Sequence, residues 1–409
     1  MANTDRRSAN VLVGVSGGIA AYKVCEVVSN LAKAGVSVRV IMTQAAETFV
    51  SALTFATLSR QAAYSDRDFW AASNGRPLHI ELGEWADLLV IAPLSANTMG
   101  KLACGLADNL LTNTVLASVC PVLLAPAMNT DMWLQAAVQE NWQRLLQSSR
   151  YHTAGPGAGR LACDRIGTGR MAEPGELLAA IYSLQHSGGR RDLQGRRILI
   201  STGSTQEYLD AVRYLGNPST GRMGIALAQA ASYRGASVSL VHGPVDPALL
   251  QPLPQQVQRT AATSAAEMQA ALVAQMDSAD WVIMAAAVAD LRPVQSAAGK
   301  LPKDRLPNPL PLEPVPDIVA GLVKQKRPGQ YVLGFAAQTG EITAPAQEKL
   351  RRKGLDAIVA NPIDQPDAGF ASDRNAGVIF DAKGHRQALK AATKLAVAHQ
   401  IFDYLSETA

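Results

Sequence analysis

Long apolar runs, paired cysteines and an excess of charge of one sign are all missing from this sequence. Its longest apolar stretches, such as Leu88–Pro93, fall far short of the length that a membrane-spanning helix needs. Its four cysteines have neither the spacing of metal ligands nor the density of a disulfide scaffold. A formal net charge of +4 over 409 residues is too weak for binding to nucleic acid or to a membrane surface. We therefore expect neither partner.

The bulk composition is that of an ordinary folded protein. With 48% hydrophobic and 18% charged residues, the chain is typical of a folded α/β protein, which excludes wholesale disorder. A chain of 409 residues exceeds what one hydrophobic core usually serves, so we expect two domains of roughly 200 residues. Met1–Asn10 is polar and leads into an apolar run without a cleavage site. Together with the sparse cysteines, this predicts a cytoplasmic location.

Two segments mark the start of a nucleotide-binding type of fold. Val11–Gly18 and Arg197–Thr205 each run from an apolar strand into a turn of small residues. Between them, Ser187–Gly195 is polar and glycine-rich and has no periodic apolar face, which is typical of a linker. This pattern predicts one domain over residues 1–190 and a second over 191–409.

Short apolar runs alternate with helical patterns in both halves. This alternation predicts an α/β protein with two doubly wound, mostly parallel, Rossmann-like domains in tandem, whose ligands bind at the carboxyl ends of the strands. Two long segments, Gly155–Arg170 and Leu291–Pro316, fit no regular element, and we interpret both as functional loops. The predicted strands are Val36–Met42, Asp87–Ala92, Pro121–Ala125, Ala236–His242, Asp280–Ala287, Tyr331–Ala337 and Asp356–Ala360.

The turn after the first strand predicts a phosphate site. Ser16, Gly17, Gly18 and Ile19 follow that strand and open a helix. Small residues let the backbone come close to a phosphate, and the free N–H groups at a helix start favour an anion. Gly14–Gly18 lacks the Gly-x-Gly-x-x-Gly spacing of a dinucleotide fingerprint, which argues against an NAD-dependent dehydrogenase.

Three further motifs narrow the interpretation of the first half: His79–Gly83, Ala92–Thr98 and Pro126–Trp133. With them, residues 10 to about 185 resemble the homo-oligomeric flavin-containing cysteine decarboxylases, whose most specific mark is Pro-x-Met-Asn-x-x-Met-Trp. The resemblance implies that FMN supplies the electron sink for loss of the carboxylate, which side chains cannot provide. The residues expected to hold FMN are Ser16, Gly17, Gly18, Ile19, Thr43, Ser95, Asn97 and Thr98.

The same resemblance implies three catalytic residues. The phosphopantothenoylcysteine branch of that family has a proton-donating cysteine on a glycine-rich flap, and Cys163 matches it here. A thiol with an ordinary pKa of about 8.5 is mostly protonated at neutral pH and can serve as an acid. His79 would assist oxidation of the substrate thiol, and Asn129 would hydrogen-bond the substrate. The usual Cys-Gly-Asp of the flap is replaced by Cys163-Asp164-Arg165, so we expect the flap geometry to differ.

The second half has the residues that activation of a carboxylate by a nucleotide requires. A small-residue turn precedes a helix starting near Gly221, which is typical of an anion site. Asp290 follows a strand, where a carboxylate can hold Mg²⁺ against a triphosphate. The cationic and amide candidates are Arg213 and Asn217 before the helix, Lys300 and Lys303 on the irregular loop, and Lys349 and Lys353 on one helix face.

Residues 192 to about 405 resemble phosphopantothenate–cysteine ligase, which in bacteria is commonly fused behind the flavin decarboxylase and uses CTP. The resemblance implies that Arg213 and Asn217 handle an acyl-cytidylate, and that Lys300 neutralises charge on the phosphates. Departures from the usual motifs are Gln206, Arg222, Val315 and Gln338. The residues expected to contact nucleotide or metal are Met284, Ala285, Ala286, Asp290, Lys300, Val315, Pro316, Asp317, Ile318, Phe335, Lys349 and Lys353.

The two resemblances together predict an enzyme of coenzyme A biosynthesis. It would join 4′-phosphopantothenate to L-cysteine with CTP and Mg²⁺, and then decarboxylate the product with FMN. The resemblance also implies a homo-oligomer, either a trimer-based dodecamer or a smaller assembly. Two alternatives stay open: a decarboxylase of another cysteine-ended substrate with an inactive second domain, and a non-catalytic FMN-binding regulatory subunit. The sequence does not separate CTP from ATP.

Overall fold

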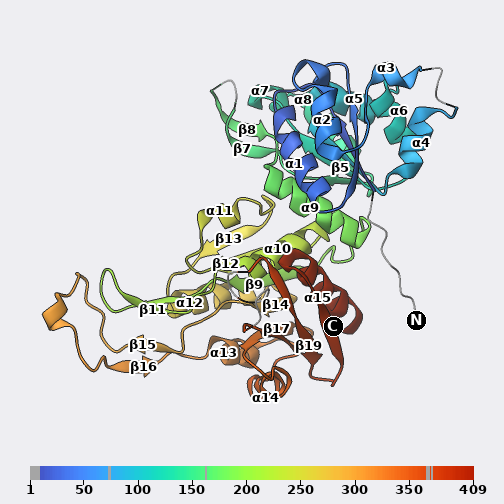
Figure 1. Cartoon of the computed structure of the whole chain (residues 1–409). Coiled ribbons are helices and arrows are strands. Elements are labelled where there is room, and N and C mark those ends of the chain that lie inside the picture. The colour runs from blue at the N-terminus through green and yellow to red at the C-terminus, as the bar shows by residue number, and fades with distance from the viewer. Residues whose placement is uncertain (1–9, 72–74, 162–163, 365–368, 370–371) are drawn as a thin grey trace. The chain divides into compact units, whose positions relative to one another are not determined.

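The computed structural model describes residues 10–71, 75–161, 164–364, 369 and 372–409. The chain divides into two compact units, Met1–Arg190 and Arg191–Ala409, which we call unit 1 and unit 2 (Figure 1). Within the described residues, no helix is both long and apolar enough to cross a membrane. Each unit is built on its own parallel sheet.

Unit 1 has a six-stranded sheet with the order β3-β2-β1-β4-β5-β6, in which every described strand pair is parallel. The side chains of β1 point alternately to the two faces of the sheet, and both faces are buried. On one face, Leu12 belongs to a core cluster with residues of α4, α5, α6 and α8. Helices α1 and α9 cover the other face. Helix α1 fits this place because Ala21, Val24, Val28 and Leu31 form one buried stripe. The main elements are β1 (Asn10–Val15), α1 (Ala21–Lys33), β2 (Ser37–Met42), η1 (Ala46–Thr48), α2 (Ala52–Ser59), β3 (Ala63–Tyr64), α3 (Asp66–Phe69), α4 (Leu78–Trp85), β4 (Leu88–Leu94), α5 (Ala96–Cys104), α6 (Leu110–Ala117), β5 (Val122–Pro126), α7 (Thr130–Leu134), α8 (Ala136–Leu146), β6 (Tyr151–Thr153) and α9 (Pro174–Ser187).

The flap, residues 155–170, is more regular than its glycine content predicts. Its described residues include an antiparallel hairpin of β7 (Gly157–Arg160) and β8 (Ile166–Arg170). The prediction of a segment without regular structure is therefore wrong here. Glycines at alternate positions of β8 leave its backbone without side chains on one side, and the hydrogen-bonded ladder forms nonetheless.

Unit 2 has an eight-stranded sheet with the order β13-β12-β9-β14-β17-β18-β19-β20 within the described residues. Alternate side chains of β14 enter two separate core layers: Ile283 packs with α10 and α15, and Val282 packs with α12, α13 and α14. The sheet is thus covered on both faces (Figure 1). Its elements are β9 (Arg197–Thr202), α10 (Arg222–Tyr233), β12 (Ser237–His242), α11 (Pro247–Leu250), β13 (Gln258–Ala261), α12 (Ala265–Met276), β14 (Trp281–Met284), α13 (Ile318–Gln325), β17 (Tyr331–Gln338), α14 (Thr343–Lys353), β18 (Ala357–Pro362), β19 (Arg374–Asp381), β20 (Arg386–Thr393) and α15 (Lys394–Thr408).

The edge of this sheet differs from a simple doubly wound fold. Strands β18, β19 and β20 pair in antiparallel fashion, whereas the pairs from β13 to β18 are parallel. The α/β class and the mostly parallel sheets are as predicted. The β19–β20 hairpin was not predicted, because its second strand is largely exposed and has no continuous apolar run.

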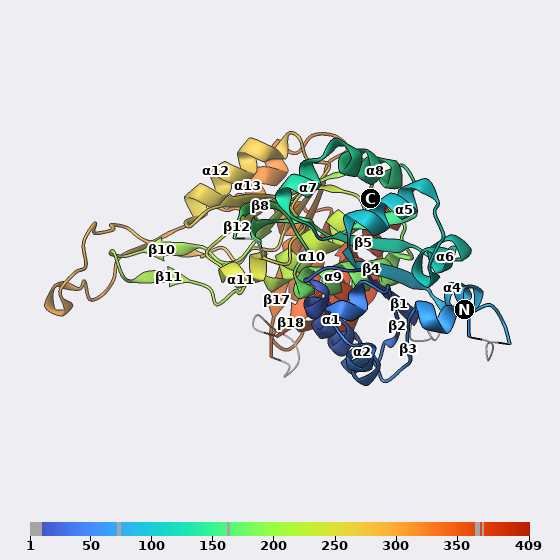
Figure 2. The same ribbon diagram turned by 90° about the horizontal axis from the view of Figure 1, so that it is seen from above.

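A long projection, which we call the arm, extends from the sheet of unit 2. It consists of residues 206–216, in which β10 (Gln206–Tyr208) pairs with β11 (Tyr214–Gly216) in antiparallel fashion, and of residues 291–314. In the second segment, β15 (Leu291–Pro293) pairs with β16 (Leu312–Pro314), and the loop between them includes the short helix η2 (Lys303–Arg305). Figures 1 and 2 both show these segments running beside each other away from the sheet. The prediction that residues 291–316 fit no regular element is therefore wrong at both ends of that segment.

Asp210 holds the two parts of the arm together. Its buried carboxylate accepts hydrogen bonds from the backbone N–H groups of Val212 (2.9 Å), Arg213 (2.7 Å) and Leu301 (3.1 Å). These bonds lower the pKa of Asp210 below its usual range, with the bond from Arg213 contributing most. The carboxylate therefore stays ionised and continues to organise the loop that contains Lys300.

Candidate active sites

The predicted phosphate turn of unit 1 is tied to the end of the neighbouring strand. The Ser16 hydroxyl is fully buried, donates to the Pro93 carbonyl oxygen (2.6 Å) and accepts from the Ser95 N–H (2.8 Å). The carboxyl ends of β1 and β4 are thereby joined by one side chain. The structure thus brings together two of the segments that the sequence predicts to contact flavin.

The backbone of this turn makes a close approach that requires glycine. A Cβ atom on Gly17 would lie 2.4 Å from the Cβ of Ala45, so a larger residue would displace the loop after β2. In that loop, Thr43 is buried, and its Oγ1 has no hydrogen-bond partner among the described residues. A buried hydroxyl of this kind is costly unless a partner completes its bonding. The turn and Thr43 therefore fit the polar part of a flavin nucleotide.

The segment after β4 is a capped helix start. The Ser95 side chain accepts from the Thr98 N–H (3.3 Å) and so caps α5, and Thr98 itself is buried. Asn97 is exposed. Of the three candidates here, Ser95 and Thr98 therefore have structural contacts, and the amide of Asn97 is accessible to a ligand.

The loop after β5 contacts the flap directly. Asn129 is the N-cap of α7, since its Oδ1 accepts from the Met132 N–H (2.8 Å). The preceding Met128 N–H donates to the Gly169 carbonyl oxygen (2.9 Å). A Cβ on Gly167 would lie 2.3 Å from the Thr130 Oγ1, so β8 fits on this loop only because it has glycine there. The flap and Asn129 thus belong to one site.

Asp164 stands where the flap motif usually has glycine, and this replacement can be followed in the structure. Asp164 has a φ of 62°, which is the left-handed conformation that favours glycine and that Asp tolerates better than most residues. The position where the family has glycine therefore keeps the backbone conformation of glycine. Arg165 forms an ion pair with Asp131 of α7, which ties this end of the flap to the same loop. Cys163 itself lies outside the described residues.

His79 lies near the start of α4. Its ring packs edge-on against Phe69 with centroids 5.4 Å apart. The Nδ1 atom is buried and has no hydrogen-bond partner among the described residues. An orphaned ring nitrogen in a half-buried histidine fits a group that bonds a ligand.

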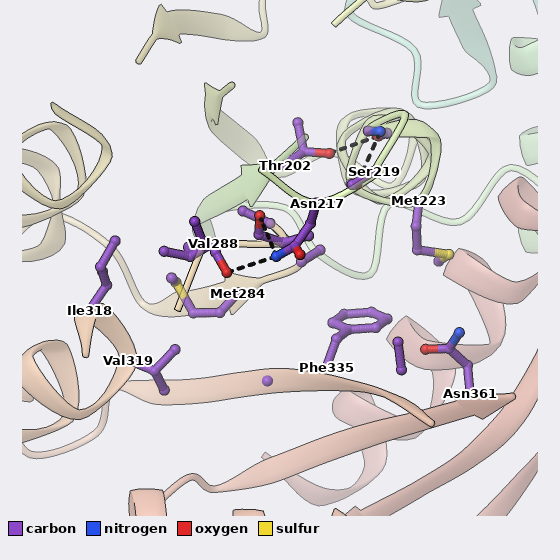
Figure 3. Close-up of a pocket in the computed structure, with 18 of the residues that line it drawn as sticks. Thr202, Asn217, Ser219, Met223, Met284, Val288, Ile318, Val319, Phe335 and Asn361 are labelled. Carbon is purple, nitrogen blue, oxygen red and sulfur yellow. Dashed lines mark hydrogen bonds between the residues drawn. The ribbon is translucent and has the colours of Figure 1, made fainter. Parts of the chain in front are cut away.

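Unit 2 has a cavity of ≈ 510 Å³ at the carboxyl ends of its parallel strands (Figure 3). Its walls come from the ends of β9, β14, β17 and β18, from the start of α10, and from α13 and α14. All the nucleotide- or metal-contact residues expected from the sequence except Lys300 line it, and these are Met284, Ala285, Ala286, Asp290, Val315, Pro316, Asp317, Ile318, Phe335, Lys349 and Lys353. Asn217, expected to handle the acyl-cytidylate, lines it as well.

The turn before α10 is held against β9 and the loop after β14. The Asn217 side-chain amide donates to the Val288 carbonyl oxygen (2.9 Å), as Figure 3 shows. Thr202 donates to the Gly221 carbonyl oxygen (2.7 Å), and a Cβ on Gly224 would lie 2.3 Å from the Thr202 side chain. These contacts bring the first turn of α10 to the cavity wall.

Two lysines and two carboxylates lie on one part of this wall. Lys349 Nζ donates to the Phe335 carbonyl oxygen (2.8 Å), and Lys353 forms an ion pair with Asp317. Burial lowers the pKa of Lys349, Arg352 lowers it further, and Asp290 partly offsets both effects. Asp290 is exposed to the cavity. This group combines cations with a free carboxylate, as a metal–triphosphate complex requires.

The described residues contain no cluster of three or more His, Cys, Asp or Glu side chains that could hold a metal by themselves. Mg²⁺ at nucleotide sites usually takes one or two carboxylates and completes its shell with phosphate oxygens and water. A lone Asp290 at the cavity fits that second arrangement.

Two predicted catalytic residues lie on the arm and are not among the residues that line the cavity. Arg213 donates to the Leu301 carbonyl oxygen (2.6 Å) and pairs with Asp210 (3.2 Å). Lys300, next to Leu301, is exposed. The structure therefore brings Arg213 and Lys300 together with each other rather than with Asn217.

Sequence reasoning missed several residues of the cavity wall, namely Asn361, Asn375 and Lys394. Asn361 is the next-to-last residue of strand β18, so the rule that ligands bind at the carboxyl ends of parallel strands could have identified it. Asn375 lies at the start of β19 and Lys394 follows β20; both strands are antiparallel, so the rule gave no signal for these two residues. Arg222, noted only as a departure from a motif, also lines the cavity.

Comparison with protein families gives one match for each unit. The family described as Flavoprotein matches residues 1–186. The family described as DNA/pantothenate metabolism flavoprotein C-terminal domain matches residues 193–408.

Several known proteins are similar to the chain. The coenzyme A biosynthesis bifunctional protein CoaBC of Bacillus subtilis (strain 168) is 41% identical over 401 residues, which are 97% of this chain and 96% of that protein. A cysteine/cysteine sulfinic acid decarboxylase from an unknown prokaryotic organism is 42% identical over 355 residues, which are 86% of this chain and 97% of that protein. The solved structure of the FMN binding protein AtHal3 is 37% identical, with a TM-score of 0.40, and the match covers 44% of this chain and 98% of that one.

Proposed function

The chain belongs to the bifunctional CoaBC family of coenzyme A biosynthesis, which unites phosphopantothenoylcysteine decarboxylase and phosphopantothenate–cysteine ligase, and we propose how its residues divide the two reactions. Unit 1 is the decarboxylase and unit 2 is the ligase. The observation that carries the division is the contrast between the neutral turn of unit 1 and the charged cavity of unit 2.

In unit 1, FMN is held by Ser16–Ile19, Thr43 and the segment Ser95–Thr98. The buried, unpartnered Oγ1 of Thr43 and the close approach at Gly17 support this assignment. When bound, FMN supplies the electron sink that lets an unactivated carboxylate leave as CO₂. The glycine backbone and neutral hydroxyls hold the cofactor without adding cations to the site.

The other residues of unit 1 act on the substrate. Asn129 donates a hydrogen bond to the substrate through its side-chain amide, while its oxygen caps α7. The unpartnered ring nitrogen of His79 accepts the proton of the substrate thiol. Cys163, on the flap that contacts the Asn129 loop, returns a proton to the carbon that lost CO₂.

In unit 2, the cavity binds CTP with Mg²⁺. Asp290 and the nucleotide phosphates ligate Mg²⁺, and Lys349 and Lys353 neutralise the phosphates. A carboxylate oxygen of 4′-phosphopantothenate attacks the α-phosphorus, and pyrophosphate leaves. The amine of L-cysteine then attacks the acyl carbon, CMP leaves, and the amine loses a proton. Asn217, fixed by the loop after β14, positions the acyl-cytidylate.

Arg213 and Lys300 act on the cavity of a second copy of the chain in a homo-oligomer. Both residues lie on the arm, and neither lines the cavity of its own unit. The arm exposes apolar side chains along its length, which favour burial against another surface: Tyr208, Val212, Tyr214, Leu291, Val294 and Leu312.

Two measurements test the division of labour. Purified protein should absorb as an oxidised flavin and release FMN on denaturation, and a colourless protein that FMN does not restore would contradict the assignment of unit 1. Incubation with 4′-phosphopantothenate, L-cysteine, CTP and Mg²⁺ should yield 4′-phosphopantetheine and CMP by mass spectrometry. Free cysteine and ATP are the control substrates, because a relative is a cysteine decarboxylase and the base is not distinguished by sequence.

A complementation experiment tests the role of the arm. A Lys300→Gln variant and an Asn217→Ala variant should each be inactive as ligases. Mixed oligomers of the two variants should regain ligase activity. The Lys300→Gln copy supplies an intact cavity, and the Asn217→Ala copy supplies an intact arm. Failure of the mixture to regain activity, although mixed oligomers form, would show that each arm serves its own cavity.

A further inference from the structure

The first turn of helix α9 is attached to both ends of the flap. At the beginning of the flap, the Gly155 N–H donates to the buried carboxylate of Glu176 (3.2 Å). At its end, the Arg170 guanidinium pairs with Glu173 (2.6 Å), the residue that precedes α9. The partial positive charge of a helix start favours both carboxylates at these positions. The two ends of the flap are therefore fixed to α9 by one carboxylate each.

Glu173 has a second cationic partner, on helix α1. The Lys23 Nζ donates to both carboxylate oxygens of Glu173 (2.9 and 3.0 Å). Helices α1 and α9 pack against each other, and Figures 1 and 2 both show them side by side. Only 13% of the Lys23 side chain is exposed, so this ammonium cannot exchange its carboxylate for water without cost. The pair therefore has a fixed geometry, unlike a solvated ion pair of the surface.

Lys23 connects Glu173 to the turn that we assign to FMN. It lies in the first turn of α1, and this helix begins just after the turn Ser16–Ile19. Ser16 is buried and bonded to the end of β4, so the chain that leads into α1 has little freedom. The position of the Lys23 ammonium therefore follows the position of the cofactor turn.

Arg170 connects Glu173 to the loop that we assign to the substrate. Arg170 is the last residue of β8, and the carbonyl oxygen of the preceding Gly169 accepts from the Met128 N–H (2.9 Å). A Cβ on Gly169 would lie 2.3 Å from the Met128 carbonyl oxygen, so the two backbones are in close contact. Met128 directly precedes Asn129. The position of the Asn129 loop therefore depends on the end of β8.

The sheet by itself leaves the distance between these two segments to loops. The cofactor turn follows β1 and the Asn129 loop follows β5, and β4 lies between the two strands. Transfer of a hydride to a flavin requires the reacting carbon at a fixed place beside the ring, and a misplacement of about 1 Å can lower a rate roughly a hundredfold. A contact outside the sheet that joins the two segments therefore bears on the rate.

We propose that Glu173 is a positioning residue of the decarboxylase, which fixes the Asn129 loop relative to the turn that holds FMN. The proposal rests on the assignment of those two segments above and adds the residue that connects them. Glu173 contacts neither ligand and acts through Lys23 on one side and Arg170 on the other. Its replacement should slow the reaction of the flavin with the substrate and leave the affinity for FMN unchanged.

The test uses the full-length protein, loaded with FMN and supplied with phosphopantothenoylcysteine. The variants are Glu173→Gln, Lys23→Gln, the double variant and Lys23→Arg. The matched control is Glu26→Gln, which changes an exposed glutamate of α1 three residues after Lys23. Stopped-flow absorbance measures the rate at which bound substrate reduces the flavin. Fluorescence titration of each apoprotein measures its FMN affinity, and the ligase rate reports whether unit 2 is intact.

Glu173→Gln should slow flavin reduction by about tenfold to a hundredfold, while its FMN affinity and the rate of Glu26→Gln stay at wild-type values. The double variant should be no slower than the slower single variant, because both substitutions break the same connection. Lys23→Arg should keep most of the rate, because a guanidinium can also donate two bonds to one carboxylate.

Wild-type flavin reduction in Glu173→Gln would overturn the proposal. A loss of FMN affinity that accounts for the slower rate would overturn it as well, because Glu173 would then only stabilise the cofactor turn. Additive losses in the double variant would show that Lys23 and Glu173 act separately, which also contradicts it. A wild-type protein that binds no FMN would instead overturn the assignment of the cofactor turn on which the proposal rests.

Discussion

The two units use the same end of the same kind of sheet, yet they present opposite chemistry there. In unit 1, the groups at the strand ends are glycine backbone, the hydroxyls of Ser16 and Thr43, and side-chain amides. In unit 2, four cations and two carboxylates line one cavity, and these are Arg222, Lys349, Lys353, Lys394, Asp290 and Asp317. The architecture therefore fixes where a ligand binds, and the residues of the loops decide which ligand it is.

The difference matches how long each ligand stays. A cofactor that remains through turnover is well served by buried neutral donors, because their bonds do not weaken with salt. Substrates and products with several phosphates must enter and leave at every cycle. In unit 2, Lys353 is paired with Asp317 and Arg222 is paired with Asp373. In each pair, phosphate oxygens of a ligand can replace the carboxylate as the partner of the cation.

The largest difference between the rates of the two reactions should follow from substitution of the flap thiol, Cys163. Replacing Cys163 with Ser removes the proton donor of the last decarboxylation step, and general acids typically contribute about 10²–10⁴-fold in rate. Release of CO₂ should continue for one turnover, after which the flavin stays reduced and an oxidised enethiol-type product remains. Stopped-flow absorbance and mass spectrometry measure both. The ligase rate is the internal control, and full turnover by the variant would make Cys163 a structural residue.

The opposite result, loss of the ligase rate with the decarboxylase rate kept, should follow from a substitution in the arm. Lys300→Gln should lower the ligase rate by about 10²–10³, because a preorganised cation no longer meets the charge that develops on the phosphates. Supplied with phosphopantothenoylcysteine, the same variant should decarboxylate at close to the wild-type rate. Lys303→Gln, three residues along the same loop, is the matched control. Parallel loss of both activities in a folded, yellow protein would contradict the separation.

A smaller effect should follow from the buried hydroxyl of unit 1. Thr43→Val keeps the shape of the side chain and removes the group that we assign to FMN. Loss of one hydrogen bond to a charged or polar ligand corresponds to about 1–3 kcal/mol, or roughly a tenfold to hundredfold weaker FMN affinity. Fluorescence titration of the apoprotein with FMN measures this change. Unchanged or tighter FMN binding in the variant would mean that Oγ1 has no ligand to bond.

Some site residues could be predicted from the sequence and others could not, and the reason is physical. Residues such as Ser16 and Ala285 follow apolar strands directly, and a parallel sheet brings strand ends together without further information. Lys394 comes at the start of the last helix, where only the packing of α15 beside α10 brings it to the cavity. Likewise, the pairing of Arg213 with the Lys300 loop depends on hydrogen bonds made by Asp210, which no local pattern predicts.

The smallest expected effect concerns the charge of two lysines of the cavity wall, Lys394 and Lys349, whose pKa values are both lowered by burial. With a pKa lowered to about 8, Lys394 is largely neutral at pH 9 in the free protein. A phosphate bound beside it stabilises the ammonium and raises its pKa, so binding at pH 9 should take up protons, by less than one per site. At pH 7 the lysine is already charged and should contribute no uptake.

Calorimetry of CTP–Mg²⁺ binding in two buffers with different ionisation enthalpies measures this uptake for wild type, for Lys394→Met and for the control Lys390→Met, which changes an exposed lysine of β20. The difference between wild type and Lys394→Met isolates the lysine, because the ligand's own protonation and the contribution of Lys349 are common to both proteins. Uptake at pH 9 that is lost in Lys394→Met and kept in Lys390→Met would locate the titrating group at the start of α15. Equal uptake in all three proteins would assign it to Lys349, whose pKa is also lowered by burial. The phosphates of the nucleotide would then lie beside α14 rather than beside the start of α15.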